Sequence, residues 1–149
     1  MRCSRRRLQS EMDFYLKLVV PSDPRFLSIA RTAVSEVCTI CGLSEELCQR
    51  VTLAVDEALA NVIRHAYKSR NDREMELECQ ASAHRIVFKL FDQGEPPDPA
   101  RICGQPLNDV SLSGRGTHLI RAIMDEMSYK QTSGKNELRL VKILPGAPR

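Results

Sequence analysis

The chain has 149 residues, of which 42% are hydrophobic and 28% charged, and its net charge is +3. This composition is typical of one globular domain that can bury a core without disulfides or a structural metal. Aromatic residues make up only 5%, with no Trp. Stacking platforms for bases are therefore scarce, which argues against a nucleic-acid-binding protein. No run is long and apolar enough to span a bilayer and none has the features of a secretion signal, so we expect a cytoplasmic protein without a membrane partner.

The first ten residues differ in composition from the rest of the chain. Residues 1–10 contain three consecutive arginines and no apolar period. We interpret them as a disordered basic tail; the alternative is an arm that touches an acidic partner. A single domain is then expected over residues 11–145. Its first element is a strand over Met12–Val20, where the pattern of side chains alternates.

Two helices are predicted after this strand. Asp23 and Pro24 suit the N-cap and the first position of a helix that runs to about Cys41. We expect its buried face to consist of Phe26, Ile29, Ala33, Val37 and Ile40. The second helix runs from its N-cap at Ser44 to about Tyr67. Its expected buried face is Leu47, Val51, Val55, Ala58 and Val62.

The rest of the chain predicts a hairpin, a loop, a helix and a second hairpin. The expected elements are strands over Glu74–Gln80 and Arg85–Phe91, a helix from Gly114 to about Met127, and strands over Ser128–Thr132 and Asn136–Leu144. A proline-rich loop from Asp92 to about Ser113 precedes the helix, and its last part, from Ile102, has the composition of a movable lid. The order β, α, α, β, β, loop, α, β, β predicts an α+β fold. We expect a two-layer sandwich with helices on one face of a mostly antiparallel mixed sheet.

Six cysteines are scattered through the predicted helices and strands: Cys3, Cys38, Cys41, Cys48, Cys79 and Cys103. Reduced thiols are expected in a chain of this length without a signal peptide. Cys38 and Cys41 form a C-x-x-C, so a zinc or redox site is an alternative, but the second pair of ligands is missing. Both residues fall on the helical apolar period. We therefore interpret them as buried structural cysteines.

The second helix carries a polar stripe. Glu57 and Asn61 are one turn apart, and Arg64 and His65 extend the same side by another turn. A carboxylate that can orient or deprotonate a hydroxyl thus lies beside a carboxamide oxygen suited to a hard cation such as Mg²⁺. The pattern alone also fits two solvated polar residues on an amphipathic helix.

A second candidate site lies where a predicted strand ends. The carboxylate of Asp92 can accept a hydrogen bond from the exocyclic amine of adenine, whereas guanine would leave this acceptor unpaired. Gly94 lets the backbone pass close to a ligand. An ordinary turn or capping Asp is the alternative interpretation of Asp92.

A third candidate site is glycine-rich. Gly114, Arg115 and Gly116 open a helix, whose first N–H groups are unpaired and attract phosphate. Thr117 or His118 in the first turn could add side-chain donors. A single G-x-G is also a common turn, so this segment alone is weak evidence.

Together and in this order, the three motifs resemble the ATP-binding domain shared by histidine kinases, gyrase and related ATPases. Within that superfamily the chain is most similar to the anti-sigma factor serine kinases, small proteins that bind a sigma factor and phosphorylate an antagonist protein. The matching runs are V-D-E-A-L-A-N-V-I-R-H-A-Y, F-D-Q-G-E-P-P-D-P and G-R-G-T-H-L-I-R-A-I-M-D-E-M. Pro96, where many histidine kinases have a second glycine, favours the anti-sigma branch.

The resemblance implies an ATP-dependent protein serine kinase that uses ATP and Mg²⁺. The implied roles are Glu57 as general base, Asn61 as Mg²⁺ ligand, Asp92 as reader of adenine, Gly94 as part of the base pocket, and Gly114, Arg115 and Gly116 along the phosphates. Thr117 stands where this branch often has an apolar residue, which makes ATP binding better supported than turnover. The implied partners are a sigma factor, an antagonist with a phosphorylatable serine, and a second copy of the chain, with Met12–Val20 either at the dimer interface or simply a sheet strand.

Two alternatives remain at this point. The first is a non-catalytic ATP-binding regulatory module that sequesters a partner protein. The second is a detached histidine-kinase catalytic domain, which is disfavoured because no dimerisation helices with a phospho-acceptor histidine occur in the sequence. A domain that binds no nucleotide would require the three motifs to coincide in order by chance.

Overall fold

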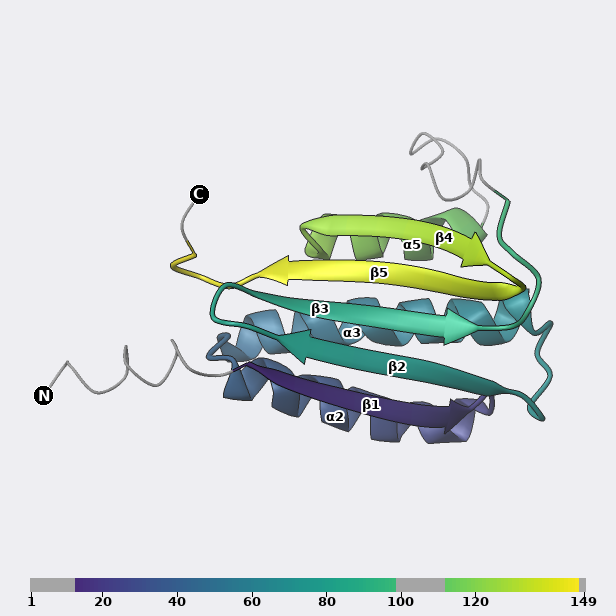
Figure 1. Cartoon of the computed structure of the whole chain (residues 1–149), viewed down its shortest axis with the longest axis horizontal. Helices are drawn as coiled ribbons and strands as arrows, with labels where there is room; N and C mark the ends of the chain where they lie inside the picture. The colour runs from purple at the N-terminus through teal and green to yellow at the C-terminus, as the bar shows by residue number, and fades with distance from the viewer. Residues whose placement is uncertain (1–12, 99–111, 148–149) are drawn as a thin grey trace, which may run out of the picture.

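In the part of the chain that the structure describes, five strands form one sheet, and helices cover one of its faces (Figure 1). The computed structural model describes residues 13–98 and 112–147, so the predicted tail over residues 1–10 lies outside the described part. In chain order the elements are β1 (Phe14–Pro21), η1 (Pro24–Phe26), α2 (Leu27–Ile40), α3 (Glu45–Asn61), η2 (Val62–Ala66), β2 (Glu74–Ala81), β3 (Arg85–Asp92), α5 (Leu112–Ile123), β4 (Glu126–Thr132) and β5 (Lys135–Ile143). The α+β two-layer prediction is confirmed, while the domain limits of 11–145 stay a prediction.

The sheet has the strand order β1-β2-β3-β5-β4. Every pair of neighbouring described strands is antiparallel, so the parallel pairing allowed by the expected mixed sheet does not occur among them. The predicted hairpins are both present. In the β4–β5 turn, Ser133 and Gly134 have φ values of 52° and 77°, the left-handed conformation that suits a tight hairpin.

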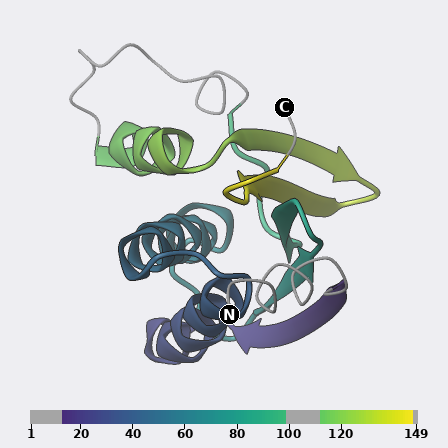
Figure 2. The same ribbon diagram turned by 90° about the vertical axis from the view of Figure 1, so that its left-hand side faces the viewer.

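The core lies between the sheet and the helices, which form separate layers when the molecule is seen from the side (Figure 2). Phe88, at the centre of β3, is fully buried and pairs with Cys79 on β2 and Leu140 on β5. A fully buried side chain of this size contributes about 1.5–3 kcal/mol. From the helical layer, α3 contributes Val51, Val55 and Ala58, as predicted, while Leu47 and Val62 are only partly buried.

The buried face predicted for the first helix was largely wrong. Phe26, Ile29 and Ile40 are 38%, 56% and 46% exposed, and of the expected set only Val37 is buried. The buried face instead consists of Leu27, Ala30, Val34, Val37 and Cys38. Both sets recur at helical spacing because apolar residues cover more than half of this helix. Packing against α3 and the sheet selects one of them.

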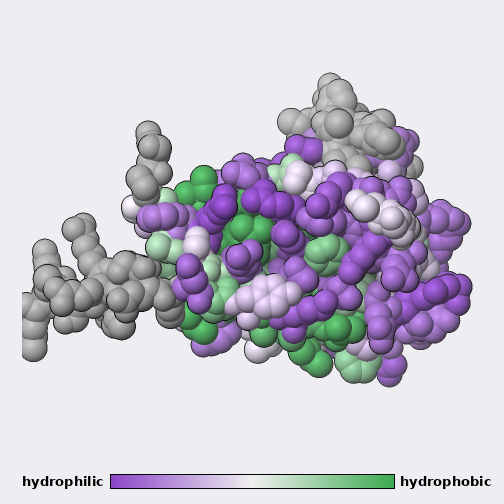
Figure 3. Space-filling view, viewed as in Figure 1, coloured by the Kyte–Doolittle hydropathy of each residue, from purple (hydrophilic) through white to green (hydrophobic). Residues whose placement is uncertain are grey.

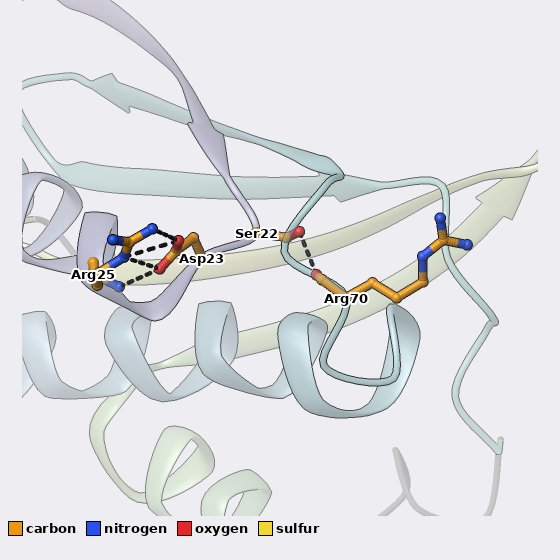
Figure 4. Close-up of polar contacts among 4 residues, drawn as sticks. All are labelled: Ser22, Asp23, Arg25 and Arg70. Atoms are coloured by element: carbon orange, nitrogen blue, oxygen red, sulfur yellow. Dashed lines mark hydrogen bonds and ion pairs between the residues drawn. The ribbon is translucent and has the colours of Figure 1, made fainter.

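The segment before α2 is held by local and long-range polar contacts (Figure 4). Asp23 accepts from the backbone N–H of Arg25 and from its guanidinium, so the predicted N-cap is confirmed, although it caps the 3₁₀ turn η1. The hydroxyl of Ser22, which is fully buried, donates to the Arg70 carbonyl at 2.6 Å and accepts from the Arg73 amide at 3.1 Å. This hydroxyl ties the end of β1 to the loop before β2.

Two predicted helix ends differ in the structure. Ser44 caps α3 as expected, accepting from the Leu47 amide at 3.3 Å, but α3 ends at Asn61 and not near Tyr67. The chain continues as a π turn, η2, in which the Tyr67 amide donates to the carbonyl of Val62, five residues back. The last helix spans Leu112–Ile123 and not Gly114 to Met127, so Met127 belongs to β4.

The sheet face opposite the helices is mostly hydrophilic, with a few apolar patches (Figure 3). Ion pairs cross neighbouring strands there, including Lys17 with Glu76 at 3.1 Å and Arg139 with Glu126 at 3.0 Å. Such exposed pairs contribute little stability but keep the face solvated. None of the helices in the two described ranges is long and apolar enough to cross a bilayer.

Candidate functional site

A cavity of about 280 Å³ lies where the helical layer meets the ends of β3, β4 and β5. It is lined by Ala58, Asn61, Val62, His65, Ala66, Asp92, Glu95, Pro96, Pro97, Asp98, Thr117, Ile120, Met127, Tyr129 and Leu138. Three residues from the three predicted motifs, Asn61, Asp92 and Thr117, therefore meet at one cavity. Its wall combines apolar side chains with a few polar groups, which is typical of a ligand site.

The π turn η2 forms one wall of this cavity and fixes the loop that follows β3. The carbonyl of Ala66 accepts from the Glu95 amide at 3.0 Å. A Cβ placed on Gly94 would collide with the backbone carbonyl and the side chain of Ala66, so only glycine fits there. The close approach seen at Gly94 is to the chain itself, at Ala66, and the role of Gly94 in a ligand pocket stays a prediction.

The end of η2 is anchored by Tyr67, which is 6% exposed. Its hydroxyl donates to the carbonyl of Glu74 at 2.6 Å and accepts from the amide of Gln93 at 3.0 Å. One side chain thus links the helix end, the start of β2 and the loop after Asp92.

Asp92 is buried at the end of β3, and one of its two oxygens is occupied. Oδ1 accepts from the Gly94 amide at 2.9 Å and from Asn136 Nδ2 at 2.8 Å. Among the described residues no hydrogen bond reaches Oδ2, so this oxygen is available to a ligand. Burial raises the pKa of the Asp92 carboxyl, and the two hydrogen bonds act in the opposite direction.

Glu57 and Asn61 lie together on α3, as their spacing predicts, and Arg64 bridges them. Nη2 of Arg64 lies 2.8 Å from Glu57 Oε1 and 2.9 Å from Asn61 Oδ1. The side chains of Arg64 and Glu57 are 52% and 26% exposed, so this cluster opens to solvent. The guanidinium therefore contacts one carboxylate oxygen of the predicted general base and the amide oxygen of the predicted Mg²⁺ ligand.

The glycine-rich segment contacts this cluster directly. Helix α5 begins at Leu112, which places Gly114 and Arg115 in its first turn, although the Arg115 side chain lies outside what the structure describes. Gly116 is buried, and a Cβ built on it would collide with Oε1 of Glu57. The second glycine of the motif therefore gives room to the predicted general base.

Sequence reasoning missed Asn136 and Tyr129. Asn136 is 1% exposed on β5, and its Oδ1 accepts from the Tyr129 hydroxyl at 2.8 Å. The available signal was the alternation of β5, which places Asn136 on the same inward face as Leu138 and Leu140. A polar residue on a buried face requires partners, and here they are Asp92 and Gly94.

Residues 20–142 match the histidine kinase-like ATPase domain family. The chain belongs to this family. Among curated proteins, this ATPase domain is similar to the serine-protein kinase RsbW of Oceanobacillus iheyensis, with 27% identity over 128 residues, 80% of this chain and 81% of the relative. The serine-protein kinase RsbW of Bacillus subtilis (strain 168) is 26% identical over 132 residues, covering 80% of each chain. The predicted resemblance to the anti-sigma factor serine kinases is confirmed by these relatives.

Solved structures show the same fold. The RsbU and RsbW domains of Rv1364c from Mycobacterium tuberculosis match with a TM-score of 0.64 and 13% identity over 90% of this chain, which spans about a third (34%) of that chain. The histidine kinase domain of a blue-light-activated kinase from Erythrobacter litoralis matches with a TM-score of 0.53 and 17% identity over 81% of this chain and 60% of the other. The histidine kinase-like ATPase fold is therefore present in this domain.

Four cysteines in the described part of this ATPase domain belong to its core. Cys38, Cys41, Cys48 and Cys79 are buried free thiols. Burial raises the pKa of Cys38 to about 12 and of Cys41 to about 11. In the described ranges no group of three or more His, Cys, Asp or Glu side chains could hold a metal ion. The predicted burial of Cys38 and Cys41 is confirmed, and their purely structural role stays an interpretation.

Proposed function

We propose that the chain is an ATP-dependent protein serine kinase that acts as an anti-sigma factor. It binds a sigma factor and phosphorylates a serine of an antagonist protein. The observation that carries the proposal is the convergence of residues from the three motifs on one cavity, whose lining includes Asp92, Thr117 and Asn61, the neighbour of Glu57 on α3. The relatives named serine-protein kinase support the choice of reaction.

In this proposal Asp92 accepts a hydrogen bond from the adenine amine through Oδ2. The apolar wall, which includes Ile120, Met127 and Leu138, covers the base. The first turn of α5 supplies N–H donors for the phosphates, as helix N-termini do for anions. The Thr117 side chain, which lines the cavity, adds a hydroxyl donor near them.

Asn61 and its neighbours fit a magnesium ion. Mg²⁺ prefers oxygen ligands and is usually held by one or two protein oxygens together with substrate phosphates. The Asn61 carboxamide oxygen lies at the cavity within hydrogen-bond distance of a displaceable guanidinium. When bound, Mg²⁺ would neutralise charge on the phosphates.

Glu57 is the proposed general base. Its carboxylate orients the serine hydroxyl of the antagonist and takes its proton as the serine oxygen bonds to the terminal phosphorus of ATP. The bond from phosphorus to the bridging oxygen breaks, and ADP leaves. Catalysis of this kind depends on position and charge neutralisation, so one base, one cation and a helix N-terminus are sufficient.

The test is transfer of labelled phosphate from ATP and Mg²⁺ to candidate antagonist proteins. The wild type should label a serine, whereas Glu57→Ala should bind ATP and transfer at least roughly 100-fold more slowly. Glu57→Gln is the matched variant, because its amide oxygen can still accept from Arg64 and only the base is lost. Equal transfer by either variant would remove Glu57 from the mechanism.

A non-catalytic ATP-binding module that sequesters a partner is the second candidate. The observation that favours it is the 2.8 Å contact between Arg64 and Glu57, which keeps the proposed base paired. This candidate predicts ATP-dependent thermal stabilisation of the wild type without label on any antagonist.

We further propose that the protein is cytoplasmic and forms a homodimer. β1 is an edge strand of the sheet, and Tyr15 and Val19 on it are more than half exposed, with 58% and 55% accessibility. An apolar edge strand is suited to pairing with another chain. Sedimentation of the wild type and of Val19→Lys tests the proposed homodimer. The wild type should sediment as a dimer and the variant as a monomer, and a wild-type monomer would contradict the homodimer.

A further inference from the structure

A chain of hydrogen bonds connects Asp92 on β3 to Asn136 on β5 and to Tyr129 on β4. The Tyr129 hydroxyl on β4 donates to Asn136 Oδ1 on β5 at 2.8 Å. Nδ2 of Asn136 donates to Asp92 Oδ1 on β3 at 2.8 Å and to the Gly94 carbonyl at 3.0 Å. Asn136 is 1% exposed, so these contacts form away from solvent.

Only one orientation of the Asn136 amide satisfies this network. A flipped amide would place its oxygen against Asp92 Oδ1 and the Gly94 carbonyl, which are both acceptors. The Tyr129 hydroxyl can donate or accept, so it fits this orientation and the two acceptors, Asp92 and Gly94, select it. A buried group with unmatched partners is costly, so the amide is fixed.

The fixed amide determines which oxygen of Asp92 a ligand meets. Oδ1 is saturated by Asn136 and by the Gly94 amide, and Oδ2 is the acceptor that remains. The bond to the Gly94 carbonyl also ties the loop after β3 to β5. Without Asn136, the Asp92 carboxylate could rotate and the loop would lose this tie to β5.

We propose that Asn136 is a positioning residue that sets the base selectivity of the nucleotide site by holding the Asp92 carboxylate in one orientation. The inference rests on the proposed ATP site. An ionised carboxylate oxygen offers only an acceptor, which matches the 6-amino group of adenine and opposes the 6-oxygen of hypoxanthine. Selectivity between these bases therefore reports the orientation of Asp92.

The test compares the binding of ATP and inosine triphosphate, which differ at the 6-position, by calorimetric titration with Mg²⁺. The wild type should prefer ATP by roughly 10–100-fold, because the wrong base leaves buried acceptors unpaired. Asn136→Leu should weaken ATP binding by roughly tenfold or more and inosine triphosphate binding much less, so the selectivity ratio falls. Gln131→Leu is the control, since Gln131 is exposed on β4 directly opposite Asn136.

Tyr129→Phe removes one hydroxyl and keeps the ring, which provides a second test if Asn136→Leu fails to fold. It should lower the selectivity ratio in the same direction by a smaller factor. Equal weakening of both nucleotides, with an unchanged ratio, would show that Asn136 only supports the fold and would overturn this inference alone. A folded wild type that binds neither nucleotide would overturn the ATP site itself, and the inference with it.

Discussion

The Nη2 atom of Arg64 lies 2.8 Å from Oε1 of Glu57, so a guanidinium rests on the carboxylate proposed as general base. The same nitrogen contacts Asn61. A guanidinium that bridges two such acceptors can exchange them for phosphate oxygens, to which it binds well. Substrate phosphates would thus release the proposed base and the proposed magnesium ligand together.

Arg64→Met should therefore affect ligand binding more than stability. The exposed ion pair contributes less than about 1 kcal/mol to the free energy of unfolding, so urea denaturation should change little. The affinity for ATP with Mg²⁺ should fall by roughly tenfold, because one charge-assisted contact is lost. ADP binding should change less. Unchanged ATP affinity would place Arg64 outside the phosphate site.

Gly116→Ala should slow phosphate transfer without unfolding the domain. The added Cβ meets the flexible end of the Glu57 side chain, which can move aside, and alanine favours a helix by about 1 kcal/mol over glycine. Displacing the base by about 1 Å can cost roughly 100-fold in rate. Transfer assays and thermal melts of the variant check this expectation.

Gly94→Ala is the matched comparison for Gly116→Ala. At this position the added Cβ meets the backbone carbonyl of Ala66, which cannot move without the π turn. Both stability and ATP affinity should fall, with a stability loss of about 1–3 kcal/mol. Equal effects of the two variants on melting temperature would contradict the expectation that the fixed Ala66 backbone at Gly94 tolerates a Cβ less well than the flexible Glu57 side chain at Gly116.

Asp92→Asn should raise stability and lower ATP affinity. Burial raises the folded-state pKa of Asp92 above its unfolded value, so the ionised carboxylate costs stability above the folded pKa, and this cost disappears as the pH falls toward the unfolded pKa. The variant should be more stable than the wild type at neutral pH, and the difference should vanish below about pH 4. Urea denaturation across this pH range measures it.

The Asp92→Asn substitution should also weaken ATP binding, for a reason separate from its effect on stability. The amide introduced by Asp92→Asn keeps an acceptor for Gly94 and Asn136 but presents an N–H donor in place of Oδ2. ATP affinity should fall roughly 10–100-fold, since two donors then face each other. A variant that is less stable at neutral pH, or that binds ATP as the wild type does, would contradict the assignment of Asp92.

The buried thiols should resist alkylation in the folded protein. Burial raises the pKa of Cys79 to about 12, so its thiolate is scarce at neutral pH. The same holds for Cys38 and Cys41. Mass spectrometry after brief alkylation should show these three unmodified until denaturant is added. Rapid modification of Cys38 or Cys41 in the native state would instead support a redox role for this C-x-x-C pair.

Local signals predicted the parts of the fold that depend on neighbouring residues. The cap at Ser44 and the hairpin of β2 and β3 follow from a few adjacent side chains. The buried face of α2 did not, because its apolar residues cover two overlapping stripes and only tertiary packing distinguishes them. The π turn was not predicted either, and the Ala66 carbonyl at its end accepts from the Glu95 amide in the loop after β3, a contact that local sequence does not indicate.

In the candidate site, too, contacts within one helix could be predicted from the sequence and contacts between distant elements could not. Spacing on one helix places Glu57 beside Asn61, so that pair could be found from the sequence. Asn136 is 44 residues from Asp92. A single polar residue in a predicted strand does not indicate which distant side chain it will hydrogen-bond. The contact of Gly116 with Glu57 likewise depends on how α5 packs on α3.

The π turn has a consequence for the residue that follows it. Val62 and Ala66 within the turn line the cavity, while Tyr67 directly after it contacts the start of β2 and the loop beyond Asp92. The Tyr67 amide donates to the carbonyl five residues back, so this last turn is wider than an α turn. One widened turn therefore sets both the shape of the cavity wall and the anchoring of the neighbouring loop, and a change in its length would disturb the two together.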